Sequence, residues 1–462
     1  SFVSAPAFVG LRKGGGMQWL TYELGVPIAM VLVISFIGPA LHRSGAVSAY
    51  SLLEKRFGVS TRLLLSSVFL ISRSFATGVV VYTVCLILSS ITGMVFWQTM
   101  LILALITIVY SLEGGMKAVV YSEVAQMIIK FLGIIMIGYL ALTYLGGWSK
   151  FLAVLDKNRL QVLNFSSTGF DGTEFGFWPM LFGGIFLYTA YYGTDQTQAQ
   201  RILSAKSELT VKKLLLFNGL FRFPITLAYC FGGLALGAFV SVTPSFAQLI
   251  PAEKPDLMVP MFISHYVPNG LIGVLVVALI AAGMSAYSST LNSLSAITME
   301  DFVSRKVTLS EEKYVRYSKL TALFWGVFTM ILAFYVGGIA KTVIEAINKI
   351  SSMFYGPVLA VFLIAFVTRQ IGAKAMNIGL ITGVLVNLIM WLWYKEVFWF
   401  WWNFIGCFVT CSVAWLTEQV LGSNKYYTNQ TLGFVKAPKE TAILLIYLVL
   451  ILLFCYFLPQ MF

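Results

Sequence analysis

The sequence predicts an all-α, polytopic membrane protein, and three observations support that prediction. Of the 462 residues, 59% are hydrophobic and only 11% are charged, whereas a soluble globular protein carries roughly 25% charged residues. The apolar runs are continuous and roughly twenty residues long, as membrane-spanning helices require. A transmembrane β-barrel would instead show roughly ten-residue segments of alternating polarity. The composition therefore excludes a water-soluble fold, a barrel and a disordered chain.

The apolar runs divide the chain into about thirteen helices of membrane-spanning type. Residues 1–10 are too short to cross a bilayer, and we interpret them as the second half of a helix whose first half precedes them. The predicted spans that follow are 20–41, 62–91, 97–111, 121–145, 175–200, 212–240, 268–300, 315–337, 350–368, 375–394, 400–420 and 441–461. No connection between them is long enough for a soluble domain, so we expect one transmembrane domain over 1–462.

The basic residues predict how the helices are oriented. Loops such as 42–62, 201–213 and 305–319 belong to one alternating set, which holds about twice as many Lys and Arg as the other set. We therefore place that set on the cytoplasmic face, and the long connections 146–174 and 241–267 outside. The formal net charge of +12 then reflects loops that face anionic lipid, and the expected partner is the bilayer rather than nucleic acid.

The residue types that catalysis needs are scarce. The chain has two histidines, both near predicted helix ends, and five cysteines that all fall in apolar runs. Buried packing thiols are the default interpretation of such cysteines. There is no paired acid and base, no nucleophile beside a base and no metal-ligand spacing, so we expect no catalytic residues and no enzyme.

Of the charged residues that fall inside predicted spans, where each one needs a reason, three are candidates for a functional role. Glu23 is either an interfacial carboxylate at a helix N-terminus or a hydrogen-bond acceptor for a polar solute. Arg73 lies about twelve residues, or roughly 18 Å, into its span. It is either half of an internal ion pair or a fork-shaped anchor for a substrate carboxylate. Arg222 precedes Pro224, which should kink the helix, and both a structural and a functional role stay open for it.

One span has a polar face. Ser285, Ser288, Ser289, Asn292 and Ser295 recur at steps that place them on one side of a helix. Small hydroxyl residues at such spacing form either a packing seam between membrane helices or a row of oxygen donors for a hard cation. The pattern alone does not decide between these two interpretations.

Four motifs together resemble the sodium/solute symporter family. They are EGGMKAVVYSEVAQ (113–126), YYGTDQTQAQRILSAKS (191–207), AAGMSAYSSTLNSLSAITMEDF (281–302) and ISSMFYGPVLAVFL (350–363). Each motif alone is weak, but their order and spacing extend over nearly the whole chain. The resemblance implies Na⁺-driven inward transport of a small solute across the plasma membrane by alternating access.

The resemblance also implies a fold. It is a leucine-transporter-like architecture, in which two inverted five-helix repeats form helices one to ten within about 1–369 and extra outer helices cover about 375–461. Helices one and six should be discontinuous, and Gly183-Gly184 is the expected break in helix six. Residues Asp195, Gln196, Gln200 and Arg201 are interpreted as a structural end-cap of helix six.

The family's sodium ligands map onto oxygen donors of helices one, five and eight. The matching residues are the carbonyls of Val3 and Ala282 and the hydroxyl of Ser285 for the main site, and Ser288, Ser289 and Glu123, with Ser285 shared, for a second site known in some relatives. Ala286 stands where the family usually has a second hydroxyl at the main site. That departure removes one oxygen and puts the ion affinity or ion choice of the main site in question.

The family's solute cavity maps onto residues of both repeats. The matching positions are Ser4, Ala7, Glu23, Arg73, Tyr188, Tyr191, Tyr192, Arg222 and Lys349. Ala7 and Lys349 stand where sugar carriers have a long polar residue and an amide. Arg73 and Lys349 would make the cavity rich in cations, which favours a carboxylate-bearing solute such as a sialic acid, another sugar acid or a small organic acid. A Glu23–Arg73 salt bridge would cancel much of that preference.

Three other functions remain open at this point. A Na⁺-coupled symporter of a neutral sugar or polyol would fit the same motifs. A proton-coupled carrier would use Glu123 as its coupling group in place of sodium. A transporter-like sensor is a different class, although no signalling domain accompanies the helices in this sequence. No obligate protein partner is inferred.

Overall fold

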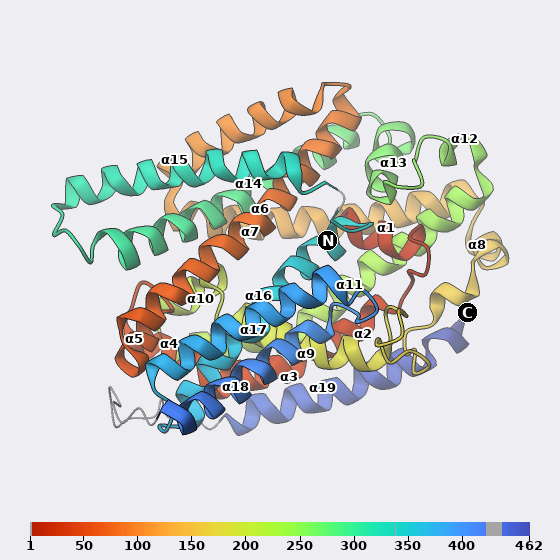
Figure 1. Ribbon diagram of the computed structural model, residues 1–462. Coiled ribbons are helices and arrows are strands. Elements are labelled where there is room, and N and C mark those ends of the chain that lie inside the picture. The colour runs from red at the N-terminus through yellow and green to blue at the C-terminus, as the bar shows by residue number, and fades with distance from the viewer. Residues whose placement is uncertain (1, 338, 422–436) are drawn as a thin grey trace.

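The computed structural model describes residues 2–337, 339–421 and 437–462, without the side chains of 108–123, 278, 281, 282 and 285. The described part is a bundle of helices without a strand (Figure 1). In chain order the α-helices are α1 (Ser4–Gly10), α2 (Trp19–Glu23), α3 (Gly25–Leu32), α4 (Gly38–Ser44), α5 (Ser51–Phe57), α6 (Val59–Thr92), α7 (Phe96–Leu145), α8 (Trp148–Val154), α9 (Phe177–Gly193), α10 (Gln196–Leu203), α11 (Glu208–Val242), α12 (Pro244–Ala247), α13 (Met258–Tyr266), α14 (Leu271–Ile297), α15 (Glu311–Tyr335), α16 (Val343–Val367), α17 (Ala373–Trp393), α18 (Trp401–Leu421) and α19 (Pro438–Phe457). Two π-helical turns, η1 (Val33–Ile37) and η4 (Thr298–Val303), and three 3₁₀ turns, η2 (Lys157–Leu160), η3 (Pro255–Leu257) and η5 (Leu458–Met461), complete the set.

Most of the predicted spans correspond to long apolar helices. Among the described residues, nine helices are long and apolar enough to cross a membrane, and η1 joins α2, α3 and α4 into the span Trp19–Ser44. The opening half-helix is α1, which is far too short to cross alone. The predicted span 175–200 is divided between α9 and α10, and 268–300 corresponds to α14 and η4. The chain is thus a multi-pass membrane protein.

Two boundaries differ from the sequence prediction. The spans 97–111 and 121–145 both fall in α7, which the structure assigns as one helix rather than two separated by a loop. The predicted break of helix six at Gly183-Gly184 is wrong, because both glycines lie inside α9. The helix is interrupted at Thr194-Asp195 instead, where both amides donate to Ala190 O and Asp195 begins α10.

Ion pairs gather basic residues at one end of the bundle, which the distribution of Lys and Arg predicts to be the cytoplasmic end. Arg62 bonds Glu54 at 2.6 Å and also pairs with Asp301, while Arg305 Nη1 lies 2.8 Å from Glu54. These pairs join α5, the start of α6, and η4. The helices α4, α5 and α10 accordingly gather at the lower left of Figure 1, whereas α8, α12 and α13 lie at the opposite end. We call these the inner and outer ends.

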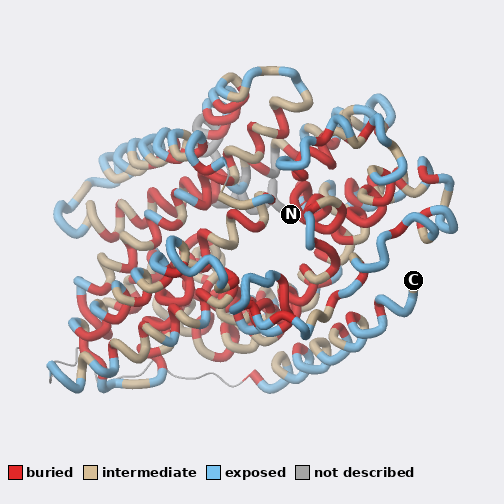
Figure 2. Tube along the Cα trace, turned by 45° about the vertical axis from the view of Figure 1, so that its right-hand side comes forward, coloured by how far each residue is buried: buried red, intermediate tan, exposed pale blue. Residues whose placement is uncertain are grey.

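Buried residues concentrate in the interior of the bundle, and exposed residues concentrate on its outer helices and loops (Figure 2). In the apolar span of α16, 83% of the residues are buried, whereas only 22% are buried in each of the spans of α15, α18 and α19. Exposed Val, Leu, Ile and Phe side chains on these outer helices suit contact with lipid tails. The site-bearing helices are thus enclosed by helices that face the membrane.

Glycines hold the short helix α1 in place. A Cβ atom on Gly10 would lie 2.5 Å from Gly233 O, and one on Gly233 would lie 2.7 Å from Pro6 Cα. Such distances exclude any side chain, so α1 and α11 approach closely along this seam. Because α1 is only seven residues long, this contact rather than its own hydrogen bonds fixes its position.

Candidate functional site

A central cavity of about 380 Å³ lies where α1, α6, α9, α11, α14 and α16 meet. Ligand pockets span roughly 300–1,000 Å³, so this one suits a small solute. The predicted solute residues that line it are Ser4, Arg73, Tyr188, Tyr191 and Arg222. They come from α1, α6, α9 and α11, so the fold brings together residues that are up to 218 positions apart in the chain, from Ser4 to Arg222.

Glu23 organises one wall of the cavity from behind. Its carboxylate accepts from Arg222 Nε at 3.1 Å, from the Tyr188 hydroxyl at 2.9 Å and from Thr226 Oγ1 at 3.1 Å. Glu23 is 1% exposed, whereas the Arg222 side chain is 35% exposed. Glu23 is therefore not an interfacial carboxylate, and it fixes the Arg222 guanidinium that lines the cavity.

Arg73 on the opposite wall forms an internal ion pair. Its Nη1 lies 3.4 Å from Asp195 Oδ2, and its Nη2 donates to Thr197 Oγ1 at 2.8 Å. The Tyr355 hydroxyl donates to the same Asp195 oxygen at 2.7 Å. The Nε of Arg73 is buried and has no acceptor among the described residues. Glu23 and Arg73 do not pair with each other: each guanidinium has a carboxylate of its own.

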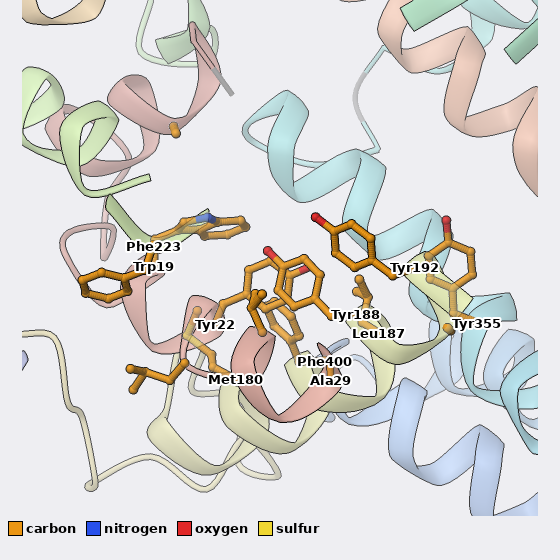
Figure 3. Close-up of a cluster of buried hydrophobic side chains, with 14 of the residues drawn as sticks. Trp19, Tyr22, Ala29, Met180, Leu187, Tyr188, Tyr192, Phe223, Tyr355 and Phe400 are labelled. Carbon is orange, nitrogen blue, oxygen red and sulfur yellow. The ribbon is translucent and has the colours of Figure 1, made fainter. Parts of the chain in front are cut away.

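Tyrosines form a row along the cavity (Figure 3). Tyr22 and Tyr188 stack with their ring centroids 4.4 Å apart, and Tyr188 stacks on Tyr192 at 6.1 Å. The ring centroid of Tyr355 lies 6.4 Å from that of Tyr191. Sequence reasoning did not select Tyr22 or Tyr355. The signals that were available are that Tyr22 precedes Glu23 and that Tyr355 lies inside one of the four motifs.

Four predicted solute residues do not line the central cavity, and Glu23, which lies behind its wall, is one of them. Ala7 is fully buried and lines neither the central cavity nor its neighbour. Tyr192 lines a neighbouring cavity of about 670 Å³ that also reaches Val3, Ala286 and Arg222. Lys349 lines neither space, because its ammonium group lies against the rings of Trp391 and Trp402 in a separate pocket. The structure thus separates it from Arg73, so the two residues do not jointly make the central cavity rich in cations.

The predicted sodium ligands are described only in part. Val3 lines the neighbouring cavity, and Ser289 lines the central one. Ser288 is 0% exposed, and its hydroxyl has no hydrogen-bond partner among the described residues. An orphaned buried oxygen costs free energy unless a ligand satisfies it, and a hydroxyl is a ligand that a hard cation accepts. Ser288 and Ser289 therefore fit a sodium ion, while the side chains of Ala282, Ser285 and Glu123 lie outside the described residues.

Three contacts close the outer side of the central cavity. The Ile344 amide donates to Ser4 Oγ at 2.9 Å, and the Val343 amide donates to Asp256 Oδ2 at 2.9 Å. Arg12 Nη2 lies 2.8 Å from Glu345 Oε1. These bonds join α1 and the loop that follows it to the first turn of α16, and they join η3 to the same turn. We call them the outer latch.

Asp256 is the acid in this latch whose charge is least compensated. It is 5% exposed, and its Oδ1 accepts no hydrogen bond from the described residues. Burial, with a smaller contribution from the nearby Glu345, raises the pKa of Asp256 to about 6, against the lowering effect of the Ser4 and Val343 hydrogen bonds. The latch therefore contains one carboxyl that titrates close to physiological pH.

Comparison with known proteins agrees with this arrangement. A family model described as the sodium:solute symporter family matches residues 1–383. The chain is 29% identical to sodium-coupled monocarboxylate transporter 2 of Bos taurus, over 84% of this chain and 63% of that protein. It is 31% identical to a putative sodium-dependent multivitamin transporter of Drosophila melanogaster, over 85% and 66%. It is 26% identical to the human sodium/iodide cotransporter, over 84% and 61%. The chain thus spans somewhat less than two thirds of the length of these relatives.

A solved structure shows the same fold. The substrate-bound, outward-open state of a Na⁺-coupled sialic acid symporter superposes with a TM-score of 0.77 at 21% identity, over 91% of this chain and 86% of that one. The likeness confirms the all-α, leucine-transporter-like architecture that the four motifs predicted.

Proposed function

The chain belongs to the sodium:solute symporter family, and on that premise we propose that it couples inward Na⁺ movement to the uptake of a small, carboxylate-bearing solute. The whole chain acts as one transporter domain in the plasma membrane, by alternating access rather than by any enzymatic step. Relatives named for monocarboxylates, iodide and vitamins are sodium-coupled, which supports the coupling ion and an anionic cargo.

The observation that supports a carboxylate is the pair of guanidinium groups on the cavity walls. Each guanidinium has five N–H donors in a fork that matches a carboxylate. Arg73 has a buried Nε without an acceptor, and Arg222 is one-third exposed towards two cavities. Each therefore keeps donor capacity beyond its own ion pair. A sugar acid such as a sialic acid, or a small organic acid, would place its carboxylate there and its hydroxyls against the tyrosines.

A neutral sugar or polyol is the second candidate, and a specific observation favours it. Glu23 and Asp195 already neutralise Arg222 and Arg73, and Lys349 lies outside the cavity. The remaining lining is rich in tyrosine rings and hydroxyls, which suit a sugar ring. The two candidates differ in whether the solute needs a negative charge.

Sodium enters this proposal as a cotransported substrate. The hydroxyls of Ser285, Ser288 and Ser289, with the carbonyls of Val3 and Ala282, would supply oxygens at the cavity that separates the start of α1 from α14. An ion bound there would tie the short helix to α14 and so pre-order Ser4 on the cavity wall. Inward movement of one Na⁺ gains about 2.3 kcal/mol per 100 mV of membrane potential. Because linkage is reciprocal, solute and ion must each raise the other's affinity. A proton-coupled carrier would instead use Glu123.

The deciding experiment measures thermal stability and uptake of the protein at its full natural length. Sialic acids, small monocarboxylates, matched amides and neutral sugars are compared in Na⁺ and in K⁺. Stabilisation by an acid but not by its amide, and only in Na⁺, supports the proposal. Stabilisation by a neutral sugar in Na⁺ would contradict a carboxylate-bearing solute and support the neutral sugar or polyol instead. Equal effects in K⁺, with uptake that follows pH, would favour the proton-coupled carrier.

A transporter-like sensor is tested by the same preparation. The protein is reconstituted into liposomes, and radiolabelled solute is followed inside them with an inward Na⁺ gradient. Accumulation above equilibrium supports transport. Tight Na⁺-dependent binding without accumulation would contradict it and point to the sensor.

A further inference from the structure

A second pocket, of about 410 Å³, lies at the outer end of the bundle and shares no lining residue with the central cavity. The first turn of α17 is held at the inner end, where Asn377 donates to Ser60 Oγ at 3.1 Å. The 21 residues of α17 then carry the chain to the opposite end. The pocket at that end is lined by Trp391, Trp399, Trp402 and Lys349. We call it the tryptophan pocket.

Lys349 and Lys395 both line this pocket, and Lys349 is the one held against its indole rings. Its Nζ lies 5.5 Å from the ring centroid of Trp391 and 5.9 Å from that of Trp402. No acceptor for its three N–H groups is found among the described residues. Two indole faces hold the ammonium by cation–π attraction, but they leave its hydrogen-bond donors unmatched.

A second donor in the same pocket is also unmatched. Trp402 is 2% exposed, and its Nε1–H has no acceptor among the described residues. A buried indole N–H usually finds a partner, because leaving it unpaired costs free energy. Lys349 and Trp402 both line the pocket, and each carries a donor group without an acceptor among the described residues.

The acids around the pocket are already engaged or lie at its rim. Glu174 pairs with Arg12 at 2.5 Å, and Arg12 also holds Glu345. Glu396 is exposed and adjoins Lys395 in the chain. The fixed charges therefore roughly balance. The pocket's selectivity for a ligand therefore comes from its unmatched hydrogen-bond donors and its aromatic ring faces rather than from its net charge.

We propose that the tryptophan pocket is a second binding site, for a small organic anion with a flat apolar body, open to the outside. The carboxylate accepts from Lys349 Nζ and Trp402 Nε1, and its body packs against the indole rings. The site is distinct from the central cavity and does not depend on the identity of the transported solute. A lipid phosphate would offer the same acceptor chemistry, and the experiment separates the two sources.

The test uses radiolabelled benzoate as the probe, with the protein in nanodiscs of phosphatidylcholine. Binding to the unchanged protein is compared with Lys349→Met, Lys349→Arg and Trp402→Phe. The matched controls are Lys341→Met, an exposed lysine outside the pocket, and Trp178→Phe, an exposed tryptophan of α9. Thermal midpoints of all variants verify that they fold.

Lys349→Met should weaken benzoate binding about tenfold, or remove one equivalent per chain if the central cavity also binds benzoate. Lys349→Arg should retain binding, Trp402→Phe should weaken it several-fold, and neither control should change it. Benzamide should not compete. Unchanged binding in a folded Lys349→Met protein overturns the proposal, as does competition by benzamide. Loss of benzoate binding when phosphatidylglycerol replaces phosphatidylcholine, in the unchanged protein and in Lys349→Arg alike, assigns the pocket to the headgroup of an anionic lipid instead, which also overturns the proposal.

Discussion

Arg222 of α11 and Glu23 of α2 meet with Nε and Oε2 3.1 Å apart, although 199 positions separate them in the chain. The sequence singles out each of them as a charge inside a membrane span, and the structure shows that they are partners. Glu23 is fully buried and Arg222 faces the cavity. Glu23 therefore holds the Arg222 guanidinium in place beside the solute cavity, while the Glu23 carboxylate itself stays out of the solute's reach.

Glu23→Gln should destabilise the protein. The change leaves the Arg222 charge without its counter-ion, and it weakens the bonds from Tyr188 and Thr226. We expect a loss of about 2 kcal/mol, below the 3–5 typical of a fully buried pair, because Arg222 is one-third exposed. Thermal unfolding in detergent measures it. The double variant Glu23→Gln/Arg222→Gln should lose less than the sum of the single changes, and strict additivity would show that the pair is not coupled.

Arg73→Gln should discriminate between the two candidate solutes. If the solute has a carboxylate, its apparent affinity should fall about tenfold or more with the loss of a charge-assisted bond. A neutral solute should lose much less. Solute-dependent thermal shifts measure the affinity, and Arg43→Gln, at an exposed arginine paired with Glu208, is the control. A large effect of the control would mean that surface charge rather than the cavity sets the affinity.

Ser288→Ala should weaken sodium and solute binding together. The Ser288 hydroxyl has no protein partner among the described residues, so its removal should cost little stability while it takes one oxygen from the ion. Ser295 is the matched serine on the same helix, because its hydroxyl already bonds Ser318 O at 2.8 Å. Na⁺ titrations with and without solute should shift for Ser288→Ala and not for Ser295→Ala. A sodium shift without a solute shift would contradict reciprocal coupling.

Asp256 should make stability depend on pH. Its pKa is about 6 in the folded protein and about 3.8 in an unfolded chain, so the folded state binds the proton more readily. Stability should therefore rise as pH falls through 6, by about 1 kcal/mol between pH 7 and pH 5, and the gain should be complete below the unfolded pKa. Thermal midpoints of Asp256→Asn should lack this rise. Glu253→Gln, at an exposed acid of the same loop, should keep it, and its loss there would contradict the assignment.

Gly233→Ala should displace α1. The new Cβ would lie 2.7 Å from the Pro6 Cα and carbonyl oxygen, and backbone atoms cannot yield as a flexible side chain can. We expect lower stability and weaker Na⁺-dependent binding, because Ser4 begins α1 and Val3 directly precedes it. Gly273→Ala in α14 meets nothing within 4 Å and should be neutral or slightly stabilising. Equal thermal midpoints for the two variants would refute the close-packing account of α1.

Hydrophobicity and the four motifs were sufficient for the membrane class, the approximate helix bounds and the fold. A run of apolar residues favours transfer of its own segment into lipid. That property can be predicted from the segment alone, without knowing which other helices pack against it. The break in helix six was misplaced because Gly183 and Gly184 serve another purpose. A Cβ at Gly183 would lie 2.3 Å from Phe400 O, and one at Gly184 would lie 2.9 Å from the Tyr22 ring. Glycine in this helix marks close packing rather than interruption.

The sequence by itself determined which charges lie in the membrane, since each of them breaks an apolar run. Only the tertiary structure decided their partners: Arg222 with Glu23, Arg73 with Asp195, and Lys349 with two indole rings rather than with the central cavity. The physical reason is that a buried charge must be compensated wherever it lies, but the compensating group can come from any helix that folding brings alongside. Which group compensates a given charge depends on how the helices pack, and the sequence of a single segment does not determine that packing.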